Sequence, residues 1–471
     1  MTKSRKSFNK KPFAITPHVL RVAVLFIAVI GTASASDIYI AQTAQGANSG
    51  ADCSNAYAVS FFNSSANWGT GPSQIGPGDK VHLCGTISAN LTFQGNGASG
   101  NPVILDGTGA TMSGYINVAT QYWTIQNTTW STSYATNSGT QAVIQTSNGA
   151  AFGSILNNHI DIMSSAQVIF FGHGTHDMTV QNNYLKVSTS SSGDGFDTDV
   201  FDTEGSYNVL VEGNYIAENI GAGDQSCGGC HDDLMQVWAA SGSSSNSPYN
   251  WTIRYNKFVQ ESSAAKTNNQ SSMMMEQIGL GTAGYFDVYS NVFQCVSGGS
   301  SGNGIVFDSN GSGMTAHIYG NTIVENAGGC NNLFNLSGSG SYNVSNNIIY
   351  NTDAGNALTG GVNFASRVHN LWYGPNIPSC SGTSDICGSN PMFANLSGGD
   401  FSLQSGSPGI GVASNLGTSY QIYPMPEATW PAPTTGNRPS TGSWDMGAFE
   451  FGSSGGSTPP NPPTGLAAVV Q

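Results

Sequence analysis

The stretch Cys227-Gly-Gly-Cys230-His231-Asp232-Asp233 places two thiols, an imidazole and two carboxyls side by side. Its Cys-x-x-Cys-His pattern is the one that attaches a c-type haem. A Cys₂His set with Asp232 as a further ligand can instead hold Zn²⁺. A third interpretation is a local disulfide between the two cysteines, which would fix where His231 and Asp232 point. The residues alone do not choose between these three.

Acidic residues concentrate around this stretch, between positions 194 and 233. Like charges at short distance repel, so such a group requires a function or a cation. Carboxylates are the ligands that Ca²⁺ prefers, and the candidates for a calcium site are Asp194, Asp197, Asp199, Asp202 and Glu204. A carboxyl pair about 5 to 9.5 Å apart can instead cleave glycosides. A solvated acidic rim without a function is the remaining alternative.

The composition indicates an all-β protein. Of 471 residues 61 are Gly, and only 8% are charged, so the residues that build helices are scarce. An apolar content of 38% is still enough to fill a long, thin core. We therefore expect a turn-rich β fold with an ordered interior rather than a disordered chain.

The first 35 residues have the form of a signal peptide. A basic start precedes a short apolar run at residues 22–30, and Ala33-Ser34-Ala35 fits a cleavage site. An N-terminal membrane anchor is the alternative; no later segment is apolar enough to span a bilayer. The sequence thus predicts a secreted or surface-associated protein, and we expect a monomer.

Cleavage after residue 35 leaves seven basic against 27 acidic residues, a net charge of −20. This charge argues against nucleic acid or anionic lipid as a partner. It permits a bound cation and a neutral or cation-bridged substrate.

Eight cysteines follow the signal region, and an even number in an exported chain favours disulfides. Nearest-neighbour pairing is the simplest arrangement. It joins Cys53 to Cys84, Cys227 to Cys230, Cys295 to Cys330 and Cys380 to Cys387.

A short pattern, apolar-x-x-Asn-x-apolar, recurs along the chain and predicts a solenoid. Its anchor residues are Asn158, Asn183, Asn214, Asn256, Asn291, Asn321 and Asn347, with looser copies at Asn127 and Asn370. Asn tolerates the left-handed backbone region, so we expect each anchor at a sharp turn. Stacked coils would also let the side-chain amides hydrogen-bond along the stack. A second short apolar element precedes most copies, so each coil should contain three strands and one long variable loop.

These repeats resemble the right-handed parallel β-helix superfamily, the pectate-lyase-like fold, over roughly residues 37–450. The end of the chain adds to the resemblance, because Asn390-Pro-Met-Phe-Ala-Asn395 and Trp444-Asp-Met-Gly-Ala-Phe-Glu450 look like the closing segment of many exported β-helix proteins. The resemblance implies a substrate groove over the first strand of each coil. It also implies a polysaccharide lyase or glycoside hydrolase acting on an acidic glycan, without assigning a specific family.

The groove implied by the resemblance would collect residues from successive coils. The predicted catalytic residues are Asp199, Asp202, His231, Asp232, Asp233 and, as a lyase base in a groove-side loop, Lys266. The predicted substrate-binding residues are His173, Gln236, Trp238 and Glu276. Ca²⁺ is the expected cofactor, and haem would have to sit in a loop, because side chains fill a β-helix interior.

We expect a signal peptide at 1–35, the β-helix at 36–451, and a Gly/Ser/Pro linker at 452–463. Residues 464–471 resemble the first strand of a fibronectin type III module. The rival to an enzyme is a non-catalytic adhesin or carbohydrate-binding β-helix. Scarce basic residues in the expected groove favour that rival.

Overall fold

A computed structural model describes residues 35–130, 142–147, 149–163, 167–189, 198–219, 232–239, 247–261, 270–276, 283–295, 302–309, 313–325, 330–352, 355–360 and 364–452. All of them belong to one compact unit, Ala35–Gln471. The expected signal peptide up to residue 34, most of the expected linker and the tail lie outside these residues. Within them, no helix is long and apolar enough to cross a membrane.

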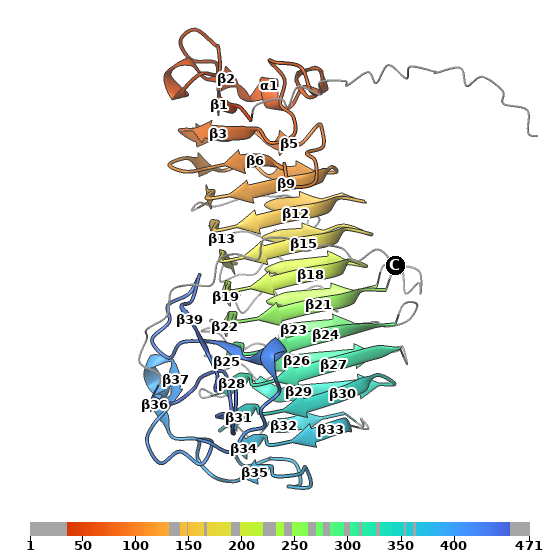
Figure 1. The fold of residues 1–471 in the computed structure, drawn as a ribbon, viewed down its shortest axis with the longest axis vertical. Coiled ribbons are helices and arrows are strands. Elements are labelled where there is room, and N and C mark those ends of the chain that lie inside the picture. The colour runs from red at the N-terminus through yellow and green to blue at the C-terminus, as the bar shows by residue number, and fades with distance from the viewer. Residues whose placement is uncertain are drawn as a thin grey trace, which may run out of the picture. The chain divides into compact units, whose positions relative to one another are not determined.

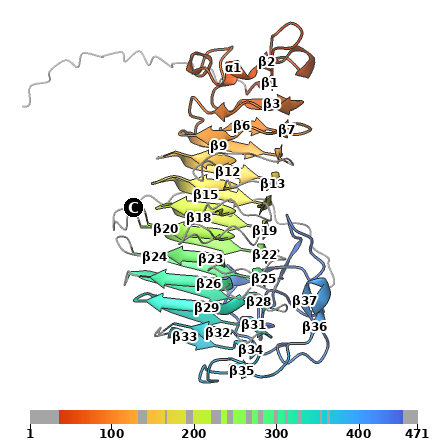
Figure 2. The same cartoon turned by 180° about the vertical axis from the view of Figure 1, so that it is seen from behind.

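Three parallel sheets contain nearly all the strands (Figures 1 and 2). Sheet 1 has ten strands: β5 (Leu91–Thr92), β8 (Ile116–Val118), β11 (Ile144–Thr146), β14 (Ile169–Phe171), β17 (Phe201–Glu204), β20 (Met235–Trp238), β23 (Gln270–Glu276), β26 (Gly302–Ser309), β29 (Cys330–Gly338) and β32 (Asn356–Thr359).

Sheet 2 has thirteen strands: β2 (Tyr57–Ala58), β1 (Asp37–Ala41), β3 (Lys80–Cys84), β6 (Val103–Asp106), β9 (Gln121–Gln126), β12 (Ala151–Leu156), β15 (His176–Gln181), β18 (Tyr207–Glu212), β21 (Tyr249–Arg254), β24 (Gly284–Tyr289), β27 (Met314–Tyr319), β30 (Ser341–Ser345) and β33 (Phe364–Val368). Sheet 3 has ten: β10 (Thr129–Trp130), β13 (His159–Met163), β16 (Tyr184–Ser188), β19 (Tyr215–Asn219), β22 (Lys257–Gln260), β25 (Val292–Cys295), β28 (Thr322–Glu325), β31 (Ile348–Asn351), β34 (Leu371–Tyr373) and β35 (Ile386–Cys387).

From β8 to β34, consecutive strands belong to different sheets, and strands three apart along the chain pair in parallel. Thus β14 pairs with β17 in sheet 1, β15 with β18 in sheet 2 and β16 with β19 in sheet 3. Only a chain that winds through three sheets once per turn produces this order. The predicted right-handed parallel β-helix with three strands per coil is confirmed.

A ladder of asparagine side chains runs along the corner between sheets 2 and 3. The backbone N–H of each ladder residue donates to Oδ1 of the ladder residue in the next coil, at 2.8–3.1 Å. The members are Asn158, Asn183, Asn214, Asn256, Asn291, Asn321, Asn347 and Asn370, each at most 1% exposed. The stacking of amides predicted from the repeat is therefore confirmed.

The left-handed backbone at this corner lies one residue earlier than predicted. Asn157, Asn182 and Gly213, each just before a ladder residue, have φ of 55°, 58° and 67°. Tyr255 and Ser290 occupy the same place in later coils. The repeat therefore requires Asn for its side-chain amide, which bridges two coils, and not for its backbone.

Apolar side chains fill the inside of the coils along their whole length. The largest fully buried ones are aromatic and include Trp123, Trp251, Phe171 and Phe201. They come from inward positions of all three sheets because side chains alternate between the two faces of a strand. This filled interior leaves function to the outward-facing positions and the loops.

The chain after the last coil folds back over sheet 3. It forms two small hairpins, β36 (Phe393–Asn395) with β37 (Asp400–Leu403) and β38 (Ile422–Pro424) with β39 (Thr435–Asn437). Figure 1 shows them beside the later strands of sheet 3. Their apolar residues form a second core with outward residues of β25, β28, β31 and β34. Among the described residues, the remaining elements are β4 (Thr86–Ile87), β7 (Thr111–Met112), the helix α1 (Val59–Phe62) and four 3₁₀ turns at Cys53–Asn55, Ser65–Asn67, Leu396–Gly398 and Thr418–Tyr420.

Two predicted disulfides are present, Cys53–Cys84 and Cys380–Cys387. Cys295 is also disulfide-bonded. The side chain of Cys330, its predicted partner, lies outside the described part of the chain, as do Cys227 and Cys230.

Candidate functional site

Four of the predicted acidic residues lie together where two neighbouring coils enter sheet 1. Asp199 precedes β17 and Asp202 lies within it, while Asp232 and Asp233 precede β20. Their exposed fractions are 5% for Asp202 and at most 1% for the other three. We call these four residues the acidic cluster. Its members interact electrostatically, because the charges of the other three all act on Asp199.

Three members of the acidic cluster brace the coils against each other. The backbone N–H of Asp233 donates to Asp199 at 2.8 Å, and that of Ser271 donates to Asp233 at 2.5 Å. In the opposite direction, the N–H of Thr198 donates to Asp232 at 2.9 Å. These contacts form a short carboxylate ladder, comparable with the asparagine ladder at the other corner. They give these three predicted catalytic residues a structural role in the coil entry.

Asp202 differs from the other three because side chains hold both of its oxygens. Gln167 Nε2 donates to Oδ2 at 2.8 Å, and Trp238 Nε1 donates to Oδ1 at 2.9 Å. Its strand neighbours Phe201 and Thr203 are buried in the interior. Because successive side chains of a strand point to opposite faces, Asp202 lies on the outer face of sheet 1. The carboxyl is thus fixed in orientation by donors from the coils before and after its own.

Burial raises the pKa of Asp202 from 3.8 to about 7, and the charges of Glu204 and Asp233 add to the increase. Hydrogen bonds from Trp238 and from the backbone of Thr203 act in the opposite direction. Burial also raises the pKa of Asp199 well above its ordinary value, with the charges of Asp202 and Asp233 as further causes. A carboxyl with a pKa near 7 can give up or take a proton under neutral conditions, which is what general acid–base catalysis requires.

The structure brings two predicted substrate-binding residues to Asp202. Gln236 is its register partner on β20, and Trp238 is the partner of Glu204. Glu276 lies at the end of β23, one strand beyond β20. His173 follows β14 in the turn toward sheet 2, where it is half-buried and its Nδ1 has no hydrogen-bond partner among the described residues.

Gln167 is the functional candidate that sequence reasoning missed. It stands immediately before the strand element of its coil, the place that Asp199 and Asp233 take in the next two coils. Alignment of the three positions in the repeat could have identified Gln167 as a candidate. Its residue type could not, because a single Gln among Ser and Ala does not indicate a catalytic or binding site.

The other predicted site residues, Asp194, Asp197, His231 and Lys266, fall outside the described residues. The haem and zinc hypotheses rest on the same part of the chain. Within the described ranges, no group of three or more His, Cys, Asp or Glu side chains is arranged to hold a metal ion. Asp202 also has both oxygens engaged by protein donors. The calcium site stays a prediction, because two of its five carboxylates, Asp194 and Asp197, lie outside the described residues.

Comparisons with known proteins give structural neighbours only. No family model matches the sequence, and no curated protein matches it. Among solved structures, pectate lyase Pel9A is 15% identical with a TM-score of 0.43, covering 89% of this chain and 98% of its own.

Two further neighbours are weaker. An alginate lyase from Paenibacillus sp. str. FPU-7 is 11% identical with a TM-score of 0.31, covering 75% of this chain and 98% of its own. A mannuronic acid-specific polysaccharide family 6 lyase from human gut microbiota is 13% identical with a TM-score of 0.36, covering 75% of this chain and 83% of its own. Values this low assign neither a family nor a reaction. What the strand order does establish is that the chain is a right-handed parallel β-helix.

Proposed function

We propose that this chain hydrolyses a polysaccharide on the outer face of sheet 1, with Asp202 as the proton donor. The observation that carries the proposal is the Asp202 carboxyl itself. It is held between Gln167 and Trp238 on an outward position, and its pKa of about 7 keeps it partly protonated at neutral pH. A carboxylic acid tuned in this way is what a glycosidase uses to protonate the leaving oxygen.

Glu204 is the candidate for the second carboxyl that hydrolysis requires. It lies two residues after Asp202 on the same strand and therefore on the same face. Two residues of extended strand span about 6.7 Å. Side chains that stand parallel would keep their carboxyls at about this separation, within the roughly 6.5–9.5 Å that leaves room for a water molecule in inverting enzymes. Glu204 is half-buried.

The reaction then balances with these two groups. Asp202 gives its proton to the glycosidic oxygen as the bond from that oxygen to the anomeric carbon breaks. Glu204 takes a proton from water, and the water oxygen bonds to the anomeric carbon. One water molecule is consumed per bond, and the anomeric configuration inverts.

The shape of sheet 1 suits a polymer. Its ten strands are stacked about 4.8 Å apart, so the outward positions form a row about 40 Å long. A small substrate would need only a few of these positions. Asp202 lies near the middle of the row, as cleavage within a chain requires.

The test is a screen of neutral and uronate polysaccharides with the full chain, in Ca²⁺ and in chelator. Hydrolysis is expected to release reducing ends without unsaturated products. Unsaturated, ultraviolet-absorbing ends would show a lyase, and binding without any product would show a carbohydrate-binding protein. Either of these results would overturn the proposal.

A further inference from the structure

The strands of sheet 1 carry acidic residues and no basic ones. Asp202 and Glu204 lie on β17, Glu276 lies on β23 and Asp308 lies on β26. No Lys, Arg or His occurs in any of the ten strands of this sheet as given above. A substrate on this face therefore meets negative charge that no strand residue offsets.

A row of uncharged residues leads from Asp202 toward the N-terminal end of sheet 1. Phe170 is the register partner of Asp202, Gln145 is the partner of Phe170, and Asn117 is the partner of Gln145. All three neutral residues are half-buried. Three strand steps of about 4.8 Å place Asn117 roughly 14 Å from Asp202. We call Asn117, Gln145 and Phe170 the neutral track.

The two amides of the neutral track have unsatisfied oxygens. Asn117 Oδ1 and Gln145 Oε1 are shielded from water and accept no hydrogen bond from the described chain. Buried polar atoms in proteins nearly always have a partner, and an exception points to a missing water or ligand. The two side chains are half-buried, so a rotation of the terminal amide would turn each oxygen outward, where a ligand can supply the missing donor.

The row is different on the other side of Asp202. After Gln236 the next register partner is Met274 on β23, which has no hydrogen-bonding group of useful strength. A hydroxyl-rich ligand therefore has more to gain on the N-terminal side.

We propose that the neutral track binds an uncharged glycan, whose hydroxyls donate to Asn117 and Gln145 and whose sugar ring lies against Phe170. This inference rests on the proposed function, because the track ends at Asp202. It also specifies the substrate class. The carboxylate of a uronate would lie close to Asp202 and Glu204 with no cationic strand residue to neutralise it, and like charges disfavour binding.

An uncharged substrate also restricts the chemistry. β-Elimination removes a proton that a neighbouring uronate carboxylate makes acidic, and a neutral sugar lacks that group. Hydrolysis with one water per bond remains available. The substrate class and the proposed reaction are thus consistent, although each is tested by a different readout.

The experiment measures binding to the full-length Asp202→Asn variant by isothermal titration calorimetry. The probes are cellohexaose, xylohexaose and mannohexaose as neutral ligands and hexagalacturonate as the acidic one, chosen after a glycan array has ranked both classes. Asn117→Ala and Gln145→Ala are each expected to weaken binding of the best neutral glycan about five-fold. Phe170→Ala is expected to weaken it on the order of ten-fold.

Asn343→Ala is the matched control, because Asn343 is a half-buried Asn on β30 of sheet 2, outside the row on sheet 1. It should leave affinity unchanged. Tighter binding of hexagalacturonate than of every neutral glycan would overturn the inference. So would an absence of neutral binders on the array, or equal affinity of the track variants and the control at unchanged melting temperature. Activity retained by Asp202→Asn would overturn the proposed function alone.

Discussion

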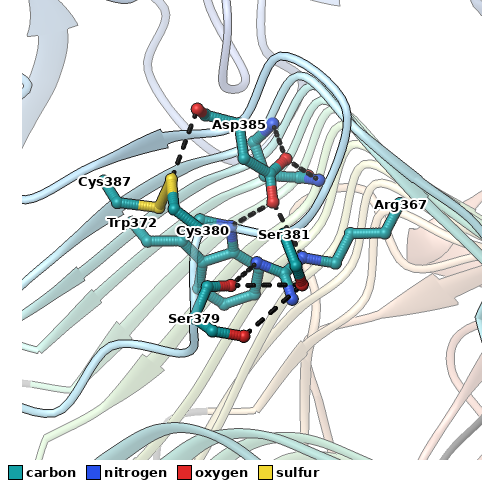
Figure 3. The surroundings of a disulfide bond; sticks show 8 residues. Arg367, Trp372, Ser379, Cys380, Ser381, Asp385 and Cys387 are labelled. Atoms are coloured by element: carbon teal, nitrogen blue, oxygen red, sulfur yellow. Dashed lines mark hydrogen bonds and ion pairs between the residues drawn. A yellow bond between two sulfur atoms is a disulfide. The ribbon is translucent and has the colours of Figure 1, made fainter.

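The backbone N–H and the side-chain amide of Asn370 both donate to Oδ1 of Asp385, at 2.9 and 3.2 Å, so an aspartate ends the asparagine ladder. The other oxygen of Asp385 accepts from Arg367 Nε at 2.7 Å and from Trp372 Nε1 at 3.2 Å. Figure 3 shows Arg367, Trp372 and Asp385 converging beside the Cys380–Cys387 disulfide. Asp385 takes the place of the next ladder residue and closes the last coil.

Asp385→Ala should lower the free energy of unfolding by about 3–5 kcal/mol. The substitution leaves Arg367, which is 9% exposed, without its buried partner and removes the acceptor of the Asn370 N–H. Urea denaturation measures the change. Asp400→Ala, at an exposed carboxyl, should stay within about 0.5 kcal/mol of the parent. Equal stability of the two variants would show that Asp385 at the end of the asparagine ladder does not stabilise the fold.

A ladder residue within the stack should be as sensitive. Asn256 accepts from the N–H of Asn214 and donates to the carbonyl of Val211, so Asn256→Ala leaves both groups buried and unpaired. We expect a loss of about 2–4 kcal/mol in urea denaturation, because each orphaned group costs about 1–3 kcal/mol. Asn356→Ala, at an exposed Asn on sheet 1, is the control. A loss for Asn256→Ala no larger than that of the control would contradict the role given to the ladder.

The acidic cluster should make stability depend on pH. Asp202 has a pKa of about 7 in the folded chain against 3.8 when unfolded, so the folded state binds its proton more tightly. The stability from this group is fully present below about pH 4 and is lost as the pH rises through about 7. The loss amounts to about 4 kcal/mol at pH 8. The profiles of the parent and Asp202→Asn, compared by urea denaturation, should converge at low pH and separate above it. If the stabilities of the two proteins changed in parallel with pH, the raised pKa of Asp202 would be ruled out.

Trp238→Phe should change the pH profile of activity. The indole N–H lowers the pKa of Asp202, so removing it raises that pKa by about 0.7 units for a typical hydrogen bond. Asp202 then keeps its proton to higher pH, and the alkaline limb of activity should move upward by that amount. A limb that stays in place while overall activity falls would mean that Trp238 serves only in packing.

The sequence was most informative where one physical demand repeats in every coil. Apolar residues around each anchor Asn predicted the strands, and the stacked amides are present from Asn158 to Asn370. The left-handed position escaped prediction because several residue types tolerate it, including Tyr255 and Ser290. The sequence predicted that the carboxyls at the coil entries are catalytic. In the structure, Asp199 and Asp233 instead accept hydrogen bonds from backbone N–H groups of the next coil.

The distinction within the acidic cluster could not be made from residue types. All four members are Asp, and only their partners separate the three that brace the coils from Asp202. Those partners come from other coils: Gln167 lies 35 residues before Asp202 and Trp238 lies 36 residues after it. Such distances along the chain depend on loop lengths that follow no period.

The most direct test of the central claim is the rate of glycosidic bond cleavage by Asp202→Asn, on the polysaccharide that the parent cleaves fastest. The comparison variant is Asp177→Asn, which changes a carboxyl on sheet 2 away from the acidic cluster. We predict a loss of about 100-fold or more for Asp202→Asn with an unchanged melting temperature at low pH, and no loss for Asp177→Asn. Parental activity in a folded Asp202→Asn variant would contradict the account.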